Sequence, residues 1–97
     1  MHTNIRWKDI DKSDAVVHHL EEKLVKIIDF LFDEEQIKVE FVHYRKIHKF
    51  KTRLNLVLKS KKLIRAEAES DDIFTSINLA VLKANDQIRR DKTKHEK

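Results

Sequence analysis

Three residue types are missing from the chain, which contains no glycine, no proline and no cysteine. Without cysteine, disulfides and thiolate chemistry are excluded, and the chain fits a reducing compartment, which we take to be the cytoplasm. Without glycine, no Gly-rich loop can cradle a phosphate, so P-loop and dinucleotide-binding fingerprints are absent. Turns must therefore be made by residues that tolerate them, such as Asn, Asp, Ser, Lys or His.

Long apolar runs are also missing, because no stretch approaches the roughly 20 residues that a membrane-spanning helix needs. The N-terminal residues lack the basic-then-apolar pattern of a signal peptide. A length of 97 residues is near the small end of what holds a single hydrophobic core. We expect one domain over residues 1–92, followed by a short, basic and disordered tail over residues 93–97, and no membrane partner.

Catalytic and metal-binding patterns are absent as well. None of the 6 histidines forms the helical i, i+4 pair with an intervening Glu that a zinc protease uses. The serines lack any signature of an activated nucleophile. We therefore expect no enzyme activity, no catalytic residues, no cofactor, no metal site and no small-molecule substrate.

Hydrophobic periodicity predicts four strands and two helices. Alternation indicates strands over residues 2–7, 37–44, 50–59 and 63–69. Helical spacing predicts one helix from Ser13 or Asp14 to about Phe32 and another over about 71–92, with Ser70 as its N-cap. The order β-α-β-β-β-α, with half-apolar strands, predicts an α+β two-layer sandwich in which two helices cover one face of a four-stranded sheet. The first two strands should be parallel if they are adjacent, and the last three should be antiparallel.

The placement of basic residues is more informative than the modest net charge of +4. On the closing helix, a stripe beside the core face contains Lys83, Gln87, Arg90 and Lys94. The first helix has a similar stripe with His19, Lys23, Lys26 and Phe30, and residues 45–49 form a basic loop. A solvated helix face and a phosphate-binding surface explain these stripes about equally well. The mixed charges on the open face of the sheet indicate cross-strand pairing.

The segment Ala66-Glu67-Ala68-Glu69-Ser70-Asp71-Asp72-Ile73-Phe74-Thr75-Ser76-Ile77-Asn78, with the element order and length, resembles the ribosome hibernation promoting factors. This family is also called the ribosome-associated inhibitors or the sigma-54 modulation proteins. The first helix is similar to the family pattern through Ala15, Val16, Leu20, Lys23, Lys26 and Ile27. Phe74, Asn78 and Asp86 depart from it, because the family usually has Tyr, Asp and a basic residue there.

The resemblance implies a cytoplasmic protein that binds the small ribosomal subunit and its rRNA in stationary phase or stress. It implies occupation of the mRNA/tRNA cleft, inhibition of translation, and a short form that works with a second hibernation factor in ribosome dimerisation. The candidate rRNA-binding residues are Lys23, Lys26, Lys83, Gln87, Arg89, Arg90, Lys92 and Lys94. Two other interpretations stay open, a double-stranded RNA-binding-like module and a protein–protein interaction module.

Overall fold

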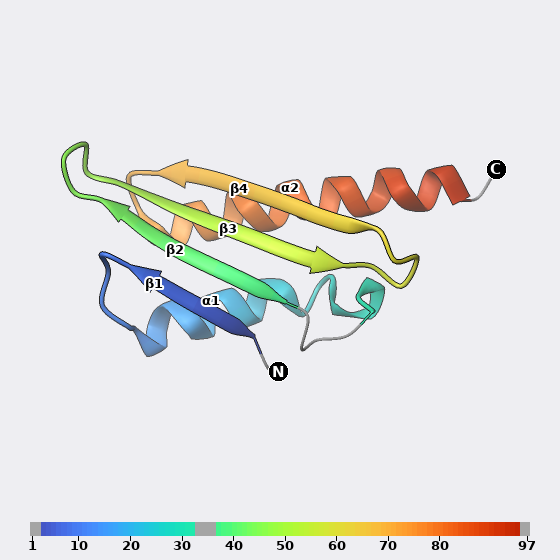
Figure 1. The fold of residues 1–97 in the computed structure, drawn as a ribbon, viewed down its shortest axis with the longest axis horizontal. Helices are drawn as coiled ribbons and strands as arrows, with labels where there is room; N and C mark the ends of the chain where they lie inside the picture. Colours follow the sequence, from blue (N-terminus) through green and yellow to red (C-terminus); the bar gives the residue numbers. More distant parts are fainter. Residues whose placement is uncertain (1–2, 33–36, 96–97) are drawn as a thin grey trace.

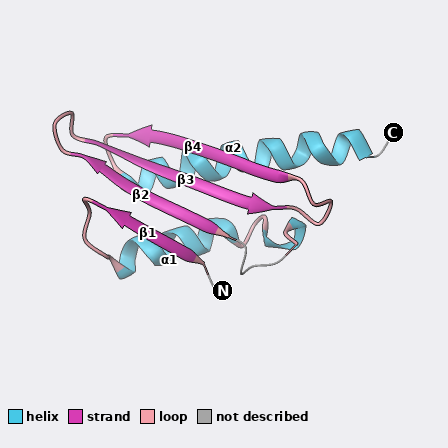
Figure 2. Cartoon of the chain, viewed as in Figure 1, coloured by secondary structure: helices cyan, strands magenta, loops and turns pink. Residues whose placement is uncertain are grey.

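The computed structural model describes residues 3–32 and 37–95, and it contains the predicted elements in the predicted order. The strands are β1 (Asn4–Lys8), β2 (Lys38–Tyr44), β3 (Lys49–Val57) and β4 (Leu63–Ser70). The helices are α1 (Asp14–Leu24), a short 3-10 helix η1 (Ile28–Phe30) and α2 (Ile73–His95). Figures 1 and 2 show both α-helices on the same face of the sheet.

The sheet has the order β1-β2-β3-β4, with β1 and β2 parallel and the other neighbours antiparallel. Both the α+β sandwich and the strand directions predicted from the sequence are confirmed. Because α1 connects two parallel strands and α2 follows β4, the two helices run in the same direction across the sheet (Figure 1). The sheet ends at β1 on one edge and at β4 on the other.

The core fills the space between the helices and the covered face of the sheet. Its fully buried members include Leu20 and Leu24 from α1, Phe41 from β2 and Ile77 from α2. Trp7 packs against this core and lies with its ring centroid 4.9 Å from that of Phe41. Burial of such side chains stabilises a fold by about 1.5–3 kcal/mol each, so this face of the sheet fixes the register of every strand.

Small residues are buried on both α2 and β4, which pack against each other. Ala66 and Ala68 on β4 and Ala80 and Ala84 on α2 are all buried in the core cluster. Since an alanine side chain is a single methyl group, the helix axis can approach this strand closely.

A buried polar pair lies where α2 crosses β3. The Thr52 and Ser76 hydroxyl oxygens are 2.7 Å apart, and Ser76 Oγ donates to the Ile73 carbonyl at 2.7 Å. Because the Ser76 hydroxyl proton is already in the hydrogen bond to Ile73, the Thr52 hydroxyl is the donor between the two side chains. Both residues are completely buried, and each has a partner inside the core.

The first helix is shorter than predicted, because α1 ends at Leu24 and not near Phe32. The segment after it turns towards the sheet, where Phe32 N donates to Val57 O at 2.8 Å and Lys59 N donates to Phe30 O at 3.0 Å. Ile27 and Leu31 are buried all the same. The helical spacing of apolar residues therefore continues past the end of α1, because Ile27 and Leu31 are buried by a turn and by a β-bridge between Leu31 and Leu58.

The N-cap of α2 was also predicted wrongly. Ser70 is the last residue of β4, and Asp72 caps the helix instead. Its Oδ2 accepts hydrogen bonds from the backbone N–H and the hydroxyl of Thr75, both at 3.0 Å.

At its C-terminal end, α2 continues to His95, so residues 93–95 belong to the helix and not to a disordered tail. The predicted strand at residues 2–7 is observed at 4–8, and residue 2 lies outside the described residues.

The buried hydroxyl pair gives an asymmetric prediction for stability. Ser76→Ala leaves the Thr52 hydroxyl without its acceptor and should lower the free energy of unfolding by about 1–3 kcal/mol. Thr52→Val leaves Ser76 bonded to Ile73 and should cost no more than about 1 kcal/mol. Urea unfolding of both variants and of the double variant measures this. Equal costs, or additive costs in the double variant, would contradict the proposed direction of the hydrogen bond.

Candidate nucleic-acid interface

A polar contact joins the two helices. His19 Nε2 and Asn78 Oδ1 are 2.6 Å apart, and because the amide oxygen only accepts, His19 donates. The His19 ring also meets Phe74 edge-on, with centroids 5.2 Å apart and an interplanar angle of 87°. His19 therefore marks the flank of α1 that faces α2, and Asn78 marks the flank of α2 that faces α1.

Three of the candidate RNA-binding residues lie on or next to these facing flanks, which we call the inner flanks. Lys23 comes one helical turn after His19, and Lys26 is exposed in the turn after α1. Arg89 lies eleven residues after Asn78, which is about three turns at 3.6 residues per turn, so it shares that flank. The structure thus brings Lys23, Lys26 and Arg89 to the same side of the helical layer.

Lys83 and Gln87 lie on the opposite flank of α2, against the edge strand β4. Lys83 Nζ donates to the Glu67 carbonyl at 3.0 Å, and Gln87 Nε2 donates to the Arg65 carbonyl at 2.8 Å. An edge strand presents unpaired carbonyls that can recruit another strand, and covering them is a common protection. These two side chains therefore have a structural role that their spacing on the helix did not reveal.

The remaining candidates come from the last turns of α2. Arg89 and Arg90 both pair with Asp86, at 3.9 Å and 2.5 Å, so one carboxylate serves two guanidinium groups and a net positive charge remains. Lys92 and Lys94 lie in the helical backbone, but their side chains fall outside the described part of the molecule. In Figure 1 this end of α2 extends beyond the sheet.

The predicted stripes therefore do not meet as one continuous surface. Lys23 and Arg89 lie on the facing flanks of the two helices, and Lys26 lies in the turn after α1, whereas Lys83 and Gln87 line the β4 edge. Sequence spacing identified which residues share a helix face. Sequence spacing carried no information on whether that face points to the other helix or to the edge of the sheet, because this depends on the rotation of each helix about its own axis.

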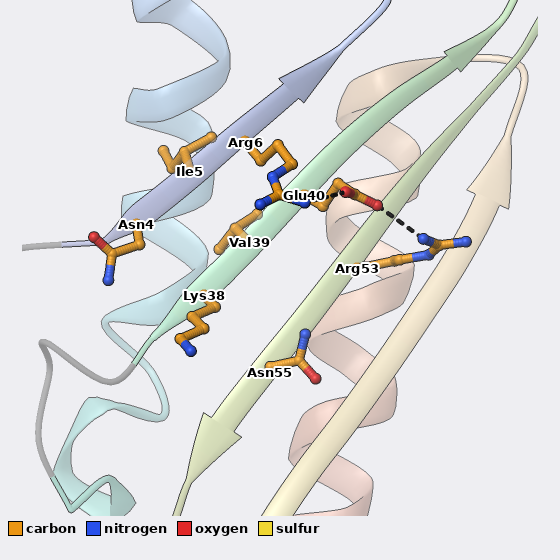
Figure 3. Close-up of a pocket in the computed structure, with 8 residues that line it drawn as sticks. All are labelled: Asn4, Ile5, Arg6, Lys38, Val39, Glu40, Arg53 and Asn55. Atoms are coloured by element: carbon orange, nitrogen blue, oxygen red, sulfur yellow. Dashed lines mark hydrogen bonds and ion pairs between the residues drawn. The ribbon is translucent and has the colours of Figure 1, made fainter.

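The open face of the sheet carries a row of alternating charge, as the sequence predicted. Arg6, Glu40, Arg53 and Glu67 are direct cross-strand neighbours on β1, β2, β3 and β4. The pairs are 3.9 Å for Arg6–Glu40, 2.8 Å for Arg53–Glu40 and 3.3 Å for Arg53–Glu67, the last without hydrogen-bond alignment. Figure 3 shows Arg6, Glu40 and Arg53 in a shallow hollow that Asn4, Lys38 and Asn55 also line. Since these four charges pair with one another, we assign this row a structural role.

Other site types were searched for among the same described residues. Within residues 3–32 and 37–95, no group of three or more His, Asp or Glu side chains could hold a metal ion. The helices in this part of the chain are also too short or too polar to cross a membrane.

Comparison with known proteins identifies the family and agrees with the fold. The profile of the family described as "Sigma 54 modulation protein / S30EA ribosomal protein" matches residues 3–96. The ribosome hibernation promotion factor of Lactococcus lactis subsp. cremoris is 27% identical over 92 residues, which cover 94% of this chain and 49% of that protein. A ribosomal subunit interface protein from Coxiella burnetii superposes with a TM-score of 0.77 at 25% identity, covering 96% of this chain and 99% of that one.

The fold is shared more widely, because the N-terminal domain of Thermus thermophilus Protein Y superposes with a TM-score of 0.75 at 24% identity, covering 93% of this chain and 96% of that one. These matches define a class of small, ribosome-related α+β proteins. The chain belongs to the sigma 54 modulation / S30EA ribosomal protein family. It spans about half the length of its Lactococcus relative.

The edge contact of Gln87 predicts an order of stability among variants that differ in their ability to donate. Gln87→Lys keeps a donor for the Arg65 carbonyl and should unfold with nearly the wild-type free energy. Gln87→Leu has similar helix propensity but no donor, and should lose about 0.5–1.5 kcal/mol. Gln87→Glu places a carboxylate against the carbonyl and should lose more. Equal urea midpoints for all three variants would show that the contact contributes nothing to stability.

Proposed function

We propose that this protein is a ribosome-binding inhibitor of translation that acts in the cytoplasm during stationary phase or stress. It occupies the cleft of the small ribosomal subunit in which mRNA and tRNA bind, and so favours inactive ribosomes. The family match over residues 3–96 carries this proposal. The names of the Lactococcus and Coxiella relatives support it.

The helical layer is the surface that we assign to rRNA. Its cations are the half-buried Lys23 on α1, the exposed Lys26 in the turn after α1, and the exposed Arg89 and Arg90 on α2, to which we add Lys92 and Lys94. Cations on a rigid surface bind structured RNA through phosphates and shape, with little base readout. The protein therefore acts by binding and occlusion, with no chemical step.

Lys83 and Gln87 remain in the proposed contact set despite their bonds to β4. The Lys83 ammonium has three N–H donors and the Glu67 carbonyl takes one of them. The Gln87 amide has two, of which Arg65 takes one. Each can hold the edge strand and still donate to a phosphate oxygen.

The proposal treats ribosome dimerisation separately from inhibition of translation. We assign silencing of the small subunit to this domain and dimerisation to its combination with a second hibernation factor. The family match over residues 3–96 supports the first assignment, and the second extends what the resemblance of the sequence implies.

Sedimentation with purified ribosomes at several salt concentrations tests the proposed function. The variant is Lys23→Gln/Lys26→Gln on the helical layer, and its control is Lys38→Gln/Arg65→Gln on the open face, with the same change in charge. Wild-type protein should co-migrate with the small subunit, and its affinity should fall steeply with salt. Losing two phosphate contacts should reduce the slope of log affinity against log salt by about 2 and weaken binding roughly tenfold or more.

The control variant should bind as the wild type does. Wild-type protein that stays at the top of the gradient in every salt condition would overturn the proposed function. Equal losses in the two variants would keep ribosome binding but remove the helical layer as its surface.

A further inference from the structure

The tip of the β2–β3 hairpin is a second basic surface, at the opposite end of the molecule from the C-terminus of α2 (Figure 1). Its residues Arg45, Lys46, Ile47 and His48 are all exposed, and Ile47 is 59% accessible. The long axis of the molecule is 46 Å, so the tip is separate from the helical surface discussed above. None of its four residues is acidic.

The tip is held in shape from both of its strands. His43 and Phe50 stack face to face, with centroids 4.3 Å apart and an interplanar angle of 6°. Phe50 itself packs against the core. The turn is completed by Ile47 N, which donates to Tyr44 O at 3.3 Å, and by His48 in a left-handed conformation with φ of 53°. A preformed loop loses less entropy when it binds a partner.

Lys49, at the base of the loop, has a different role from its neighbours. Its ammonium donates a hydrogen bond to Asp71 in the connection between β4 and α2. This hydrogen bond, with the Asp71 charge, raises the pKa of Lys49 above its ordinary value. Lys49 therefore ties the hairpin to the start of α2, and Arg45 and Lys46 supply the charge of the tip.

A hollow of about 470 Å³ lies beside these two cations, lined by Asp9, His43, Tyr44, Arg45, Lys46 and Ile47. Its wall thus combines aromatic and apolar surface, two cations and one carboxylate. Unpaired bases in RNA stack on aromatic side chains, and cations bind the adjacent phosphates. A carboxylate can accept hydrogen bonds from the amino group of a base. The same carboxylate repels an acidic peptide, so the lining fits a nucleotide better.

Building on the proposed function, we propose that the hairpin tip is a second rRNA contact that takes an unpaired nucleotide. The base lies in the hollow against Tyr44 and Ile47, with its amino edge towards Asp9. Arg45 and Lys46 bind the flanking phosphates. The protein then holds RNA at both ends of its long axis, through shape and phosphates on the helices and through one unstacked base at the hairpin.

The test compares Arg45→Gln/Lys46→Gln and Tyr44→Leu with the open-face control Lys38→Gln/Arg65→Gln, all bound to purified ribosomes. The double variant should bind roughly tenfold or more weakly, with a salt slope lower by about 2. Tyr44→Leu should weaken binding by a similar factor, because it removes a stacking surface, but should keep the wild-type slope. Chemical probing of rRNA bases should show one protected, unpaired nucleotide that both variants lose. The rRNA nucleotides that the helical layer protects should stay protected when each variant is added at saturating concentration.

Each other outcome has a defined meaning. Wild-type affinity and the full protection pattern in both hairpin variants would overturn the inference and leave the proposed function intact. Weaker binding with an unchanged rRNA protection pattern would assign the tip to a ribosomal protein, which also overturns the inference. If wild-type protein fails to bind ribosomes at all, the proposed function itself is wrong. The urea midpoint of each variant verifies that it is folded.

Discussion

The close approach of α2 to the edge strand β4 is the constraint on which the rest of the structure depends. Alanines are buried on both elements, Ala66 and Ala68 on β4 and Ala80 and Ala84 on α2, and they add little side-chain volume between helix and strand. Lys83 and Gln87 can therefore reach the outward carbonyls of β4 and cover an edge that would otherwise recruit other strands. This contact also fixes the roll of α2, because the flank that faces β4 is opposite the flank that meets His19.

The two faces of the molecule consequently carry their charges in different ways. On the open face of the sheet, Arg6, Glu40, Arg53 and Glu67 alternate in one row and neutralise one another. The helical layer also carries acids, because Asp14, Glu21, Glu22 and Asp29 accompany Lys23 and Lys26, and two arginines share Asp86. Its cations outnumber its acids only towards the C-terminal end of α2, where Arg89 and Arg90 are exposed. We therefore propose the helical layer as the RNA surface because of where these cations lie, since the net charge of the whole chain is only +4.

Much of this arrangement could be predicted from the sequence, since alternation and helical spacing report directly on which residues face a core. The order of elements along the chain, the two-layer class and the pairing of open-face charges followed from that pattern. The end of α1 did not, because Ile27 and Leu31 are buried by a turn and a bridge that mimic helical spacing. The cap of α2 was missed because Ser70 and Asp72 are both good caps, and β4 retains Ser70. The separation of Lys83 and Gln87 from Lys23 and Lys26 depends on tertiary packing, and the hollow beside the hairpin depends on contacts between distant loops.

Directed cleavage of rRNA from the two faces tests most directly that the helical layer binds the ribosome. The chain has no cysteine, so Lys26→Cys on the helical side and Asn55→Cys on the open face each give a single attachment point for an iron chelate. We predict strong cleavage of small-subunit rRNA lining the mRNA/tRNA cleft from position 26, and weak cleavage of those nucleotides from position 55. Stronger cleavage of the cleft from position 55 would contradict the assignment, because the charge-paired face of the sheet would then be the one that meets the RNA.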